Sequence, residues 1–194
     1  MKHLLAVKDL SKKEITELLW LGEKVKRSPL KYSDALSGKS LAMVFQKTST
    51  RTRVSFEAGM TQLGGHAIYL DWKTTNLQIA DVEDEIRCIG RYADIIMARV
   101  YDHKDLEVMA KAAEVPVING LSDVEHPCQI IADLLTIQEK KGKLEGVKVA
   151  FIGDGNNVCN SLISGCSKVG MTIAVATPEG HGPDKKITEE AMKT

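Results

Sequence analysis

Apolar runs alternate along this chain with segments in which apolar residues recur every three or four positions. The runs predict strands at Leu41–Phe45, Ala67–Asp71, Asp94–Val100, Val115–Asn119, Val147–Ile152 and Met171–Ala176. Alternation of strands with helical segments is typical of βαβ units, whose crossover helices cover a parallel sheet. The pattern therefore predicts an α/β fold with a parallel sheet.

The segments between these runs predict the helices. The first helix follows Ser11, whose hydroxyl can cap it together with Glu14 three residues later. Apolar positions at helical spacing predict further helices at about residues 56–63, 86–92, 127–140 and 157–169.

The polar stretch Glu139–Lys143 ends the long helical segment, as a glycine with flanking lysines can. We place a domain boundary there, so that residues 1–140 form a first domain and residues 141–194 begin a second, Rossmann-like α/β domain. One βαβ unit with a trailing helix cannot bury both faces of a sheet. We therefore expect the second domain to be incomplete in these 194 residues.

Composition and charge exclude several classes of function. The 26 Lys and Arg residues equal the 26 Asp and Glu residues, so no overall basic field is present to bind a nucleic acid, and an anion site must be local. No apolar run is long enough to cross a bilayer, and the first residues lack the apolar region of a signal peptide, which predicts a cytoplasmic protein. The cysteines form no C-x-x-C pair, so neither a metal site nor a disulfide framework is predicted.

The segment from Phe45 to Glu57 carries the clearest chemical signal. An apolar strand ends at Phe45, and helical periodicity starts after the hydroxyl-rich run Ser49–Thr52. Free backbone N–H groups and the dipole of a helix N-terminus favour an anion, and Arg51 can bind phosphate oxygens through two hydrogen bonds. The segment lacks the G-x-x-x-x-G-K pattern of a nucleotide P-loop, so the phosphate need not belong to a nucleotide.

Two other segments bear on ligand binding. Arg99 closes an apolar strand, so it lies at the carboxyl end, where ligands of parallel α/β sheets usually bind; a structural ion pair is the alternative. The turn Gly153–Val158 superficially suits a dinucleotide, but Val158 replaces the third glycine and no acidic residue closes the next strand. No nicotinamide or other cofactor is predicted.

Two motifs in order identify a family resemblance. Ser49-Thr50-Arg51-Thr52-Arg53 is similar to the carbamoyl phosphate motif of the aspartate and ornithine carbamoyltransferases, and His126-Pro127-Cys128-Gln129 resembles their second motif. The H-P-C-Q form and Phe45-x-Lys47-Thr48 resemble the ornithine members, as does the loop Gly153–Asn157. The resemblance covers the whole chain and implies a first domain that binds carbamoyl phosphate and a second that binds ornithine.

The resemblance implies roles for individual residues. The carbamoyl phosphate ligands would be Ser49, Thr50, Arg51, Thr52, Arg99, His126 and Gln129, of which the last three would also be catalytic. Cys128 would pack rather than attack, because the incoming amine needs no covalent intermediate. Asn157 would hold the amino acid end of ornithine.

The loop Lys73–Gln78 is expected to reach a neighbouring subunit's site in a homotrimer or a multiple of trimers, with Gln78 as its ligand residue. The following stretch Ile79–Asp84 is shorter and more acidic than the usual loop of the family, so a plain exposed loop is the alternative.

The implied reaction transfers the carbamoyl group of carbamoyl phosphate to the side-chain amine of L-ornithine. It gives L-citrulline and phosphate, in arginine biosynthesis or degradation, without metal or cofactor. The family's later H-C-L-P and S-M-G segments are not in these residues, so the sequence leaves the identity of the acceptor amine open. Aspartate or putrescine could be the acceptor, or the chain could be an inactive carbamoyl phosphate-binding fragment.

Overall fold

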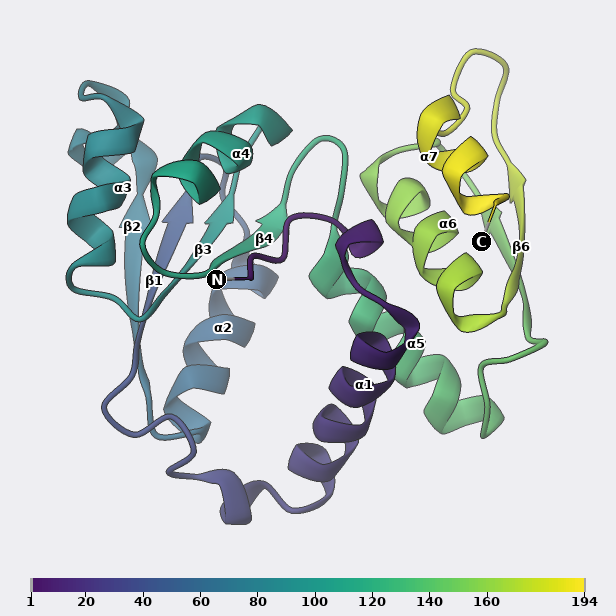
Figure 1. Cartoon of the computed structure of the whole chain (residues 1–194), viewed down its shortest axis with the longest axis horizontal. Helices are drawn as coiled ribbons and strands as arrows, with labels where there is room; N and C mark the ends of the chain where they lie inside the picture. Colours follow the sequence, from purple (N-terminus) through teal and green to yellow (C-terminus); the bar gives the residue numbers. More distant parts are fainter. Residues whose placement is uncertain (1, 194) are drawn as a thin grey trace. The chain divides into compact units, whose positions relative to one another are not determined.

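The computed structural model of the protein describes residues 2–193 (Figure 1). These residues form two compact units. The first unit contains the residues up to Leu5 together with Lys24–Ser122, and the second contains Ala6–Glu23 together with the chain from Asp123 onward.

A parallel sheet of four strands forms the centre of the first unit. In spatial order its strands are β2 (His66–Asp71), β1 (Ser40–Phe45), β3 (Ile95–Arg99) and β4 (Val117–Leu121). Five of the six residues of β1 are buried, as expected for a central strand of a parallel sheet that is covered on both faces. The predicted parallel α/β fold is confirmed, with strand bounds within two residues of those expected.

The two faces of this sheet carry separate cores because successive strand residues point to opposite sides. Leu41, Met43 and Phe45 pack with Met60 of α2 (Thr50–Gln62). Ala42 and Val44 face the opposite core, which receives Ile86 of α3 (Val82–Gly90) and Leu106 of α4 (His103–Ala112). Figure 1 shows α2 on one side of the strands and α3 with α4 on the other.

Helix α4 was not assigned by the periodicity analysis. It begins after Asp102, whose side chain accepts a hydrogen bond from the backbone N–H of Lys104 at 2.8 Å. Its buried positions Leu106, Met109 and Ala112 recur at helical spacing, but the helix has only 10 residues, so the apolar pattern is short. The helix is stabilised mainly by packing on the sheet.

The second unit contains a βαβ element. The helices and strands of the whole second unit are η1 (Val7–Asp9), the part of α1 (Lys12–Arg27) that ends at Glu23, α5 (Pro127–Lys141), β5 (Lys148–Ile152), α6 (Asn157–Val169), β6 (Thr172–Ala176) and α7 (Lys185–Ala191). β5 and β6 pair in parallel, and α6 packs against α5, α7, η1 and β6. The predicted cap of α1 is confirmed, since Ser11 and Glu14 exchange hydrogen bonds of 2.8 to 3.2 Å.

Close packing of α5 on α6 places α5 in the second unit. A side chain at Gly165 of α6 would lie 2.6 Å from Ile130 of α5, so glycine permits this approach. The compact units therefore do not coincide with the predicted division into residues 1–140 and 141–194. That division, as a boundary between domains, stays a prediction.

Candidate functional site

The N-terminus of α2 lies at the carboxyl end of β1, as the sequence predicts. Ser49 is the N-cap residue: its Oγ accepts a hydrogen bond from the backbone N–H of Thr52 at 3.3 Å. The same hydroxyl donates to Thr52 Oγ1 at 3.0 Å. Thr50 and Arg51 begin the helix and are exposed. The first turn therefore presents backbone N–H groups, hydroxyls and one guanidinium on an accessible surface.

Arg99 ends β3 beside this helix turn. It pairs with Phe45 of β1, and the β3–β4 register shifts between Ala98 and Arg99, an irregularity that can redirect a side chain. Arg99 Nη1 donates to Thr52 Oγ1 at 3.4 Å. Arg99 Nε is buried and has no hydrogen-bond partner within residues 2–193. The structure therefore brings together Ser49, Thr52 and Arg99, three of the predicted ligands.

The charges of this site favour an anion. Burial, and then the charge of Arg51, lower the pKa of the Arg99 guanidinium below its usual value. A guanidinium stays protonated at neutral pH even so, and two close cations repel each other until an anion lies between them. Arg53, the second arginine of the motif, is used differently: its Nε donates to Glu57 at 2.9 Å and its guanidinium lies 3.8 Å from the Tyr69 ring centroid.

Gln46 lies in the turn between β1 and α2, and no sequence motif predicts a role for it. Its Oε1 accepts from the backbone N–H of Tyr101 at 2.8 Å, and its Nε2 donates to Asp105 at 2.6 Å. No sequence motif links these three residues, so periodicity and spacing could not have revealed the contact.

The loop that carries Gln78 folds into two short 3-10 helices, η3 (Trp72–Thr74) and η4 (Asn76–Gln78). Leu77 is buried in the core of the first unit, whereas Gln78 is exposed. The structure places Gln78 at the end of η4, and its predicted role as a ligand of a neighbouring subunit stays a prediction.

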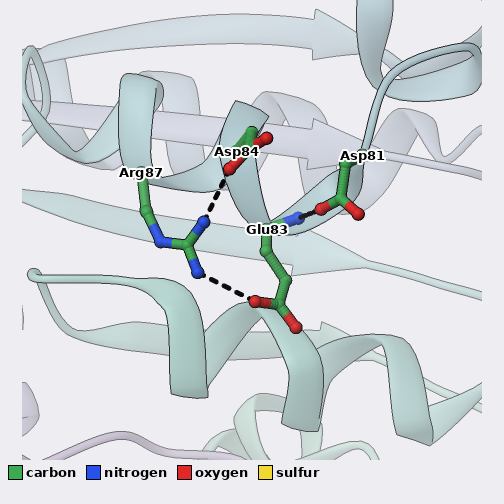
Figure 2. Close-up of polar contacts among 4 residues, drawn as sticks. All are labelled: Asp81, Glu83, Asp84 and Arg87. Carbon is green, nitrogen blue, oxygen red and sulfur yellow. Dashed lines mark hydrogen bonds and ion pairs between the residues drawn. The ribbon is translucent and has the colours of Figure 1, made fainter.

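The acidic stretch after Gln78 forms the start of α3. Asp81 accepts a hydrogen bond from the backbone N–H of Glu83 at 2.8 Å and so caps the helix (Figure 2). Arg87 then pairs with Glu83 at 2.8 Å and with Asp84 at 2.6 Å. Negative charges near a helix N-terminus stabilise the helix through its dipole, so these carboxylates stabilise α3. This explains why the stretch is acidic.

His126 lies in the second unit, as the N-cap residue of α5. Its backbone N–H donates to Ser161 Oγ of α6 at 2.8 Å, and that hydroxyl donates to the buried carboxylate of Glu125. Burial raises the pKa of Glu125 above its ordinary value, although the hydrogen bonds from Ser161 and from the Val7 N–H act in the opposite direction. Helix α6 therefore anchors the backbone just before the H-P-C-Q motif.

Gln129 and Cys128 follow on the first turn of α5. Gln129 is exposed, and its Nε2 donates to Asp133 Oδ1 at 2.9 Å, one helical turn onward. Burial raises the pKa of the Cys128 thiol to about 12. Such a thiol is a poor nucleophile at neutral pH, which agrees with the packing role predicted for it.

Asn157 is the first residue of α6. Asn156 before it caps the helix by accepting hydrogen bonds from the N–H groups of Val158 at 3.0 Å and Cys159 at 3.3 Å. A side chain at Gly155 would lie 2.2 Å from Pro183 N, so only glycine fits there. The loop before Asn157 is thus held by a second backbone segment of the same unit.

Among residues 2–193, no group of three or more His, Cys, Asp or Glu side chains could hold a metal ion. No helix there is both long enough and apolar enough to span a membrane.

A parallel α/β unit with arginines and hydroxyls at a helix N-terminus is an arrangement typical of phosphate-binding α/β proteins. Two family models match the chain: "Aspartate/ornithine carbamoyltransferase, carbamoyl-P binding domain" over residues 2–139 and "Aspartate/ornithine carbamoyltransferase, Asp/Orn binding domain" over residues 145–194. The chain belongs to the aspartate/ornithine carbamoyltransferase family.

Individual relatives agree with this assignment. The chain is 52% identical to an ornithine carbamoyltransferase of Pyrococcus horikoshii over 98% of its own length and 61% of that protein. It is 52% identical to the Bacillus subtilis ornithine carbamoyltransferase, over 99% of the chain and 59% of that protein. The solved ornithine carbamoyltransferase of Pyrococcus furiosus superposes with a TM-score of 0.95 at 51% identity, covering 98% of this chain and 62% of that one. The chain thus spans about three fifths of the length of these relatives.

Proposed function

We propose that the first unit binds carbamoyl phosphate and that the protein transfers its carbamoyl group to the side-chain amine of L-ornithine. The observation that carries the proposal is the cluster of Arg99, Thr52 and Ser49 at the N-terminus of α2. In this proposal the phosphate accepts hydrogen bonds from the α2 backbone and from Arg51, while Arg99 reaches both the phosphate and the carbonyl oxygen.

The reaction needs hydrogen-bond donors more than a nucleophilic side chain. The amine nitrogen attacks the carbonyl carbon, and the carbonyl oxygen gains negative charge in a tetrahedral species. The bond from carbon to the bridging oxygen then breaks, phosphate leaves with the electron pair, and the former amine loses a proton. Fixed donors that stabilise the charged oxygen lower this barrier, often by several kcal/mol. Arg99 and His126 are the proposed donors, and Gln129 is proposed to orient the carbamoyl amide.

The remaining roles are proposed from the resemblance of individual residues to those of the family. Asn157 is proposed to bind the amino acid end of ornithine, and Gln78 to reach a neighbouring subunit in a homotrimer. Light scattering of the purified chain tests the assembly, and a monomer that still binds carbamoyl phosphate tightly would remove Gln78 from the ligand set. A cytoplasmic location stays part of the proposal.

The choice of ornithine rests on relatives that are about 50% identical and are named ornithine carbamoyltransferases. Aspartate or putrescine as acceptor is the alternative that a direct assay must separate. Formation of citrulline, carbamoyl-aspartate and carbamoyl-putrescine from carbamoyl phosphate should be measured side by side. Citrulline alone would support the proposal, whereas carbamoyl-aspartate as the main product would overturn the assignment of the acceptor.

Binding of the two substrates can be tested separately on these 194 residues. We expect carbamoyl phosphate to bind, and ornithine to bind weakly, because Asn157 is the one acceptor contact proposed here. A single hydrogen bond contributes roughly 0.5–1.5 kcal/mol, too little to hold a hydrated zwitterion. Calorimetric titration with each ligand decides it, and micromolar ornithine binding would contradict the expectation. Carbamoyl phosphate binding without any turnover would identify a binding fragment.

A further inference from the structure

We propose that Gln46 is a positioning residue for Arg99, and that the residue at position 46 must be an amide because its partner Asp105 is an acid. The inference rests on the proposed function, since it assumes that Arg99 contacts carbamoyl phosphate. Gln46 itself is not proposed to touch the ligand.

Gln46 makes three hydrogen bonds, two to the strand end that carries Arg99 and one to α4. The backbone N–H of Gln46 donates to the carbonyl oxygen of Arg99 at 2.9 Å. The side-chain Oε1 accepts from the N–H of Tyr101, two residues after Arg99, at 2.8 Å. The side-chain Nε2 donates to Asp105 Oδ2 at 2.6 Å. The backbone that follows the Arg99 Cα is thus tied to the turn that leads into α2.

The orientation of the Gln46 amide follows from its partners. A backbone N–H can only donate, so the oxygen of the amide must face Tyr101. The NH₂ group then faces Asp105, whose carboxylate can only accept when ionised. A glutamate at position 46 would keep the bond to Tyr101 but would place a second carboxylate against Asp105. The pair is therefore specific for an amide at 46 opposite an acid at 105.

Asp105 belongs to a helix that packs on the sheet. It lies in the first turn of α4. Leu106, the residue after it, and Met109 of the same helix are fully buried. Gln46 therefore connects Arg99 to the packed core through α4. This support matters because the β3–β4 pairing shifts register between Ala98 and Arg99, so the strand ladder is irregular where Arg99 leaves it. The contact from Arg99 Nη1 to Thr52 Oγ1, at 3.4 Å, is too long to fix the side chain by itself.

The test compares two ligands in variants of the full 194-residue chain. Phosphonoacetamide, in which CH₂ replaces the bridging oxygen of carbamoyl phosphate, keeps the carbonyl group that Arg99 is proposed to contact. Inorganic phosphate lacks that carbonyl group, so it keeps the N-terminus of α2 and only one of the two contacts proposed for Arg99, the contact to phosphate. We expect Gln46→Ala to weaken phosphonoacetamide binding about tenfold, the value of one charge-assisted hydrogen bond, and to weaken phosphate binding clearly less. Gln62→Ala, at the exposed far end of α2, is the matched control.

A reversal of the pair separates positioning from general loosening. Gln46→Glu alone should weaken phosphonoacetamide binding, because two carboxylates then face each other. Adding Asp105→Asn should restore it, since the acid and the amide then exchange places across the same two positions and the Tyr101 N–H keeps its acceptor. Asp105→Asn alone should have little effect, because its amide oxygen can still accept from Gln46.

Each outcome decides the proposal. Selective loss in Gln46→Ala with recovery in the double variant supports it. Binding equal to that of Gln62→Ala, equal loss for both ligands, or no recovery in the double variant overturns it while leaving the proposed function intact. If the unaltered chain binds neither ligand, the proposed function fails first and the inference falls with it.

Discussion

Arg99 Nη1 at the end of β3 donates to Thr52 Oγ1 in the first turn of α2, across 3.4 Å. These residues are 47 positions apart in the sequence, yet the parallel pairing of β1 with β3 puts the ends of both strands at one edge of the sheet. A strand-end arginine and a helix N-terminus thereby share one small surface. That surface is the part of the proposed site that lies within a single compact unit.

Arg51→Ala should weaken carbamoyl phosphate binding at least tenfold, because a charge-assisted hydrogen bond to phosphate contributes roughly 1.5–3 kcal/mol and Arg51 can make two. Calorimetric titration measures the affinity. Arg87→Ala is a matched control, since its ion pairs with Glu83 and Asp84 are exposed. Unchanged affinity in a folded Arg51→Ala variant would remove Arg51 from the site.

His126→Ala should lower turnover about 100-fold while lowering carbamoyl phosphate affinity much less, because removal of one donor to a developing oxyanion costs roughly 10²–10³ in rate. The comparison requires a form of the enzyme that turns over. Rates under saturating substrates are measured beside calorimetric affinities. Equal turnover of the His126→Ala variant and the unaltered enzyme would exclude the proposed role of His126 as a donor.

Cys128 should resist alkylation at pH 8, because burial raises the pKa of its thiol to about 12 and very little of the thiol is then ionised. The exposed Cys88 should react under the same conditions. Peptide mass mapping after brief treatment with iodoacetamide reports both sites. Cys88→Ser should abolish most of the rapid labelling, and rapid labelling of the half-buried Cys128 would contradict its packing role.

The free energy of unfolding of the Glu125→Gln variant should rise, relative to that of the unaltered chain, as the pH rises. Burial raises the pKa of Glu125 in the fold above the ordinary value of 4.5. The folded state therefore binds this proton more tightly than the unfolded chain does, and stability is lost as pH rises from about 4.5 through the folded pKa. Glutamine keeps an oxygen for the Val7 N–H and Ser161 Oγ without this cost.

Urea unfolding of the unaltered chain and of the Glu125→Gln variant, at pH 4.5 and pH 7.5, measures the difference in their free energies of unfolding. Glu107→Gln on the exposed side of α4 is a suitable control for the removal of one carboxylate. A difference between the two proteins that does not change with pH would mean that Glu125 ionises as freely in the fold as in the unfolded chain.

The sequence by itself determined the local features of this protein. Its periodicity predicted six parallel strands. Ser11 predicted the start of α1, and the hydroxyl-rich run Ser49–Thr52 predicted a helix N-terminus where α2 begins. The sequence also predicted an arginine at the end of β3. These features depend on neighbouring residues or on strand polarity, so a linear pattern contains them.

Only the tertiary structure decided which distant side chains meet. Gln46 and Asp105 are 59 positions apart, and Glu125 and Ser161 are 36 apart, so no local period relates them. The same holds for Arg53 over the Tyr69 ring and for α5 packed on α6, which moved that helix into the second compact unit. Such contacts form because burial of apolar faces drives folding, and the polar groups that are buried with them must find hydrogen-bond partners among the residues nearby.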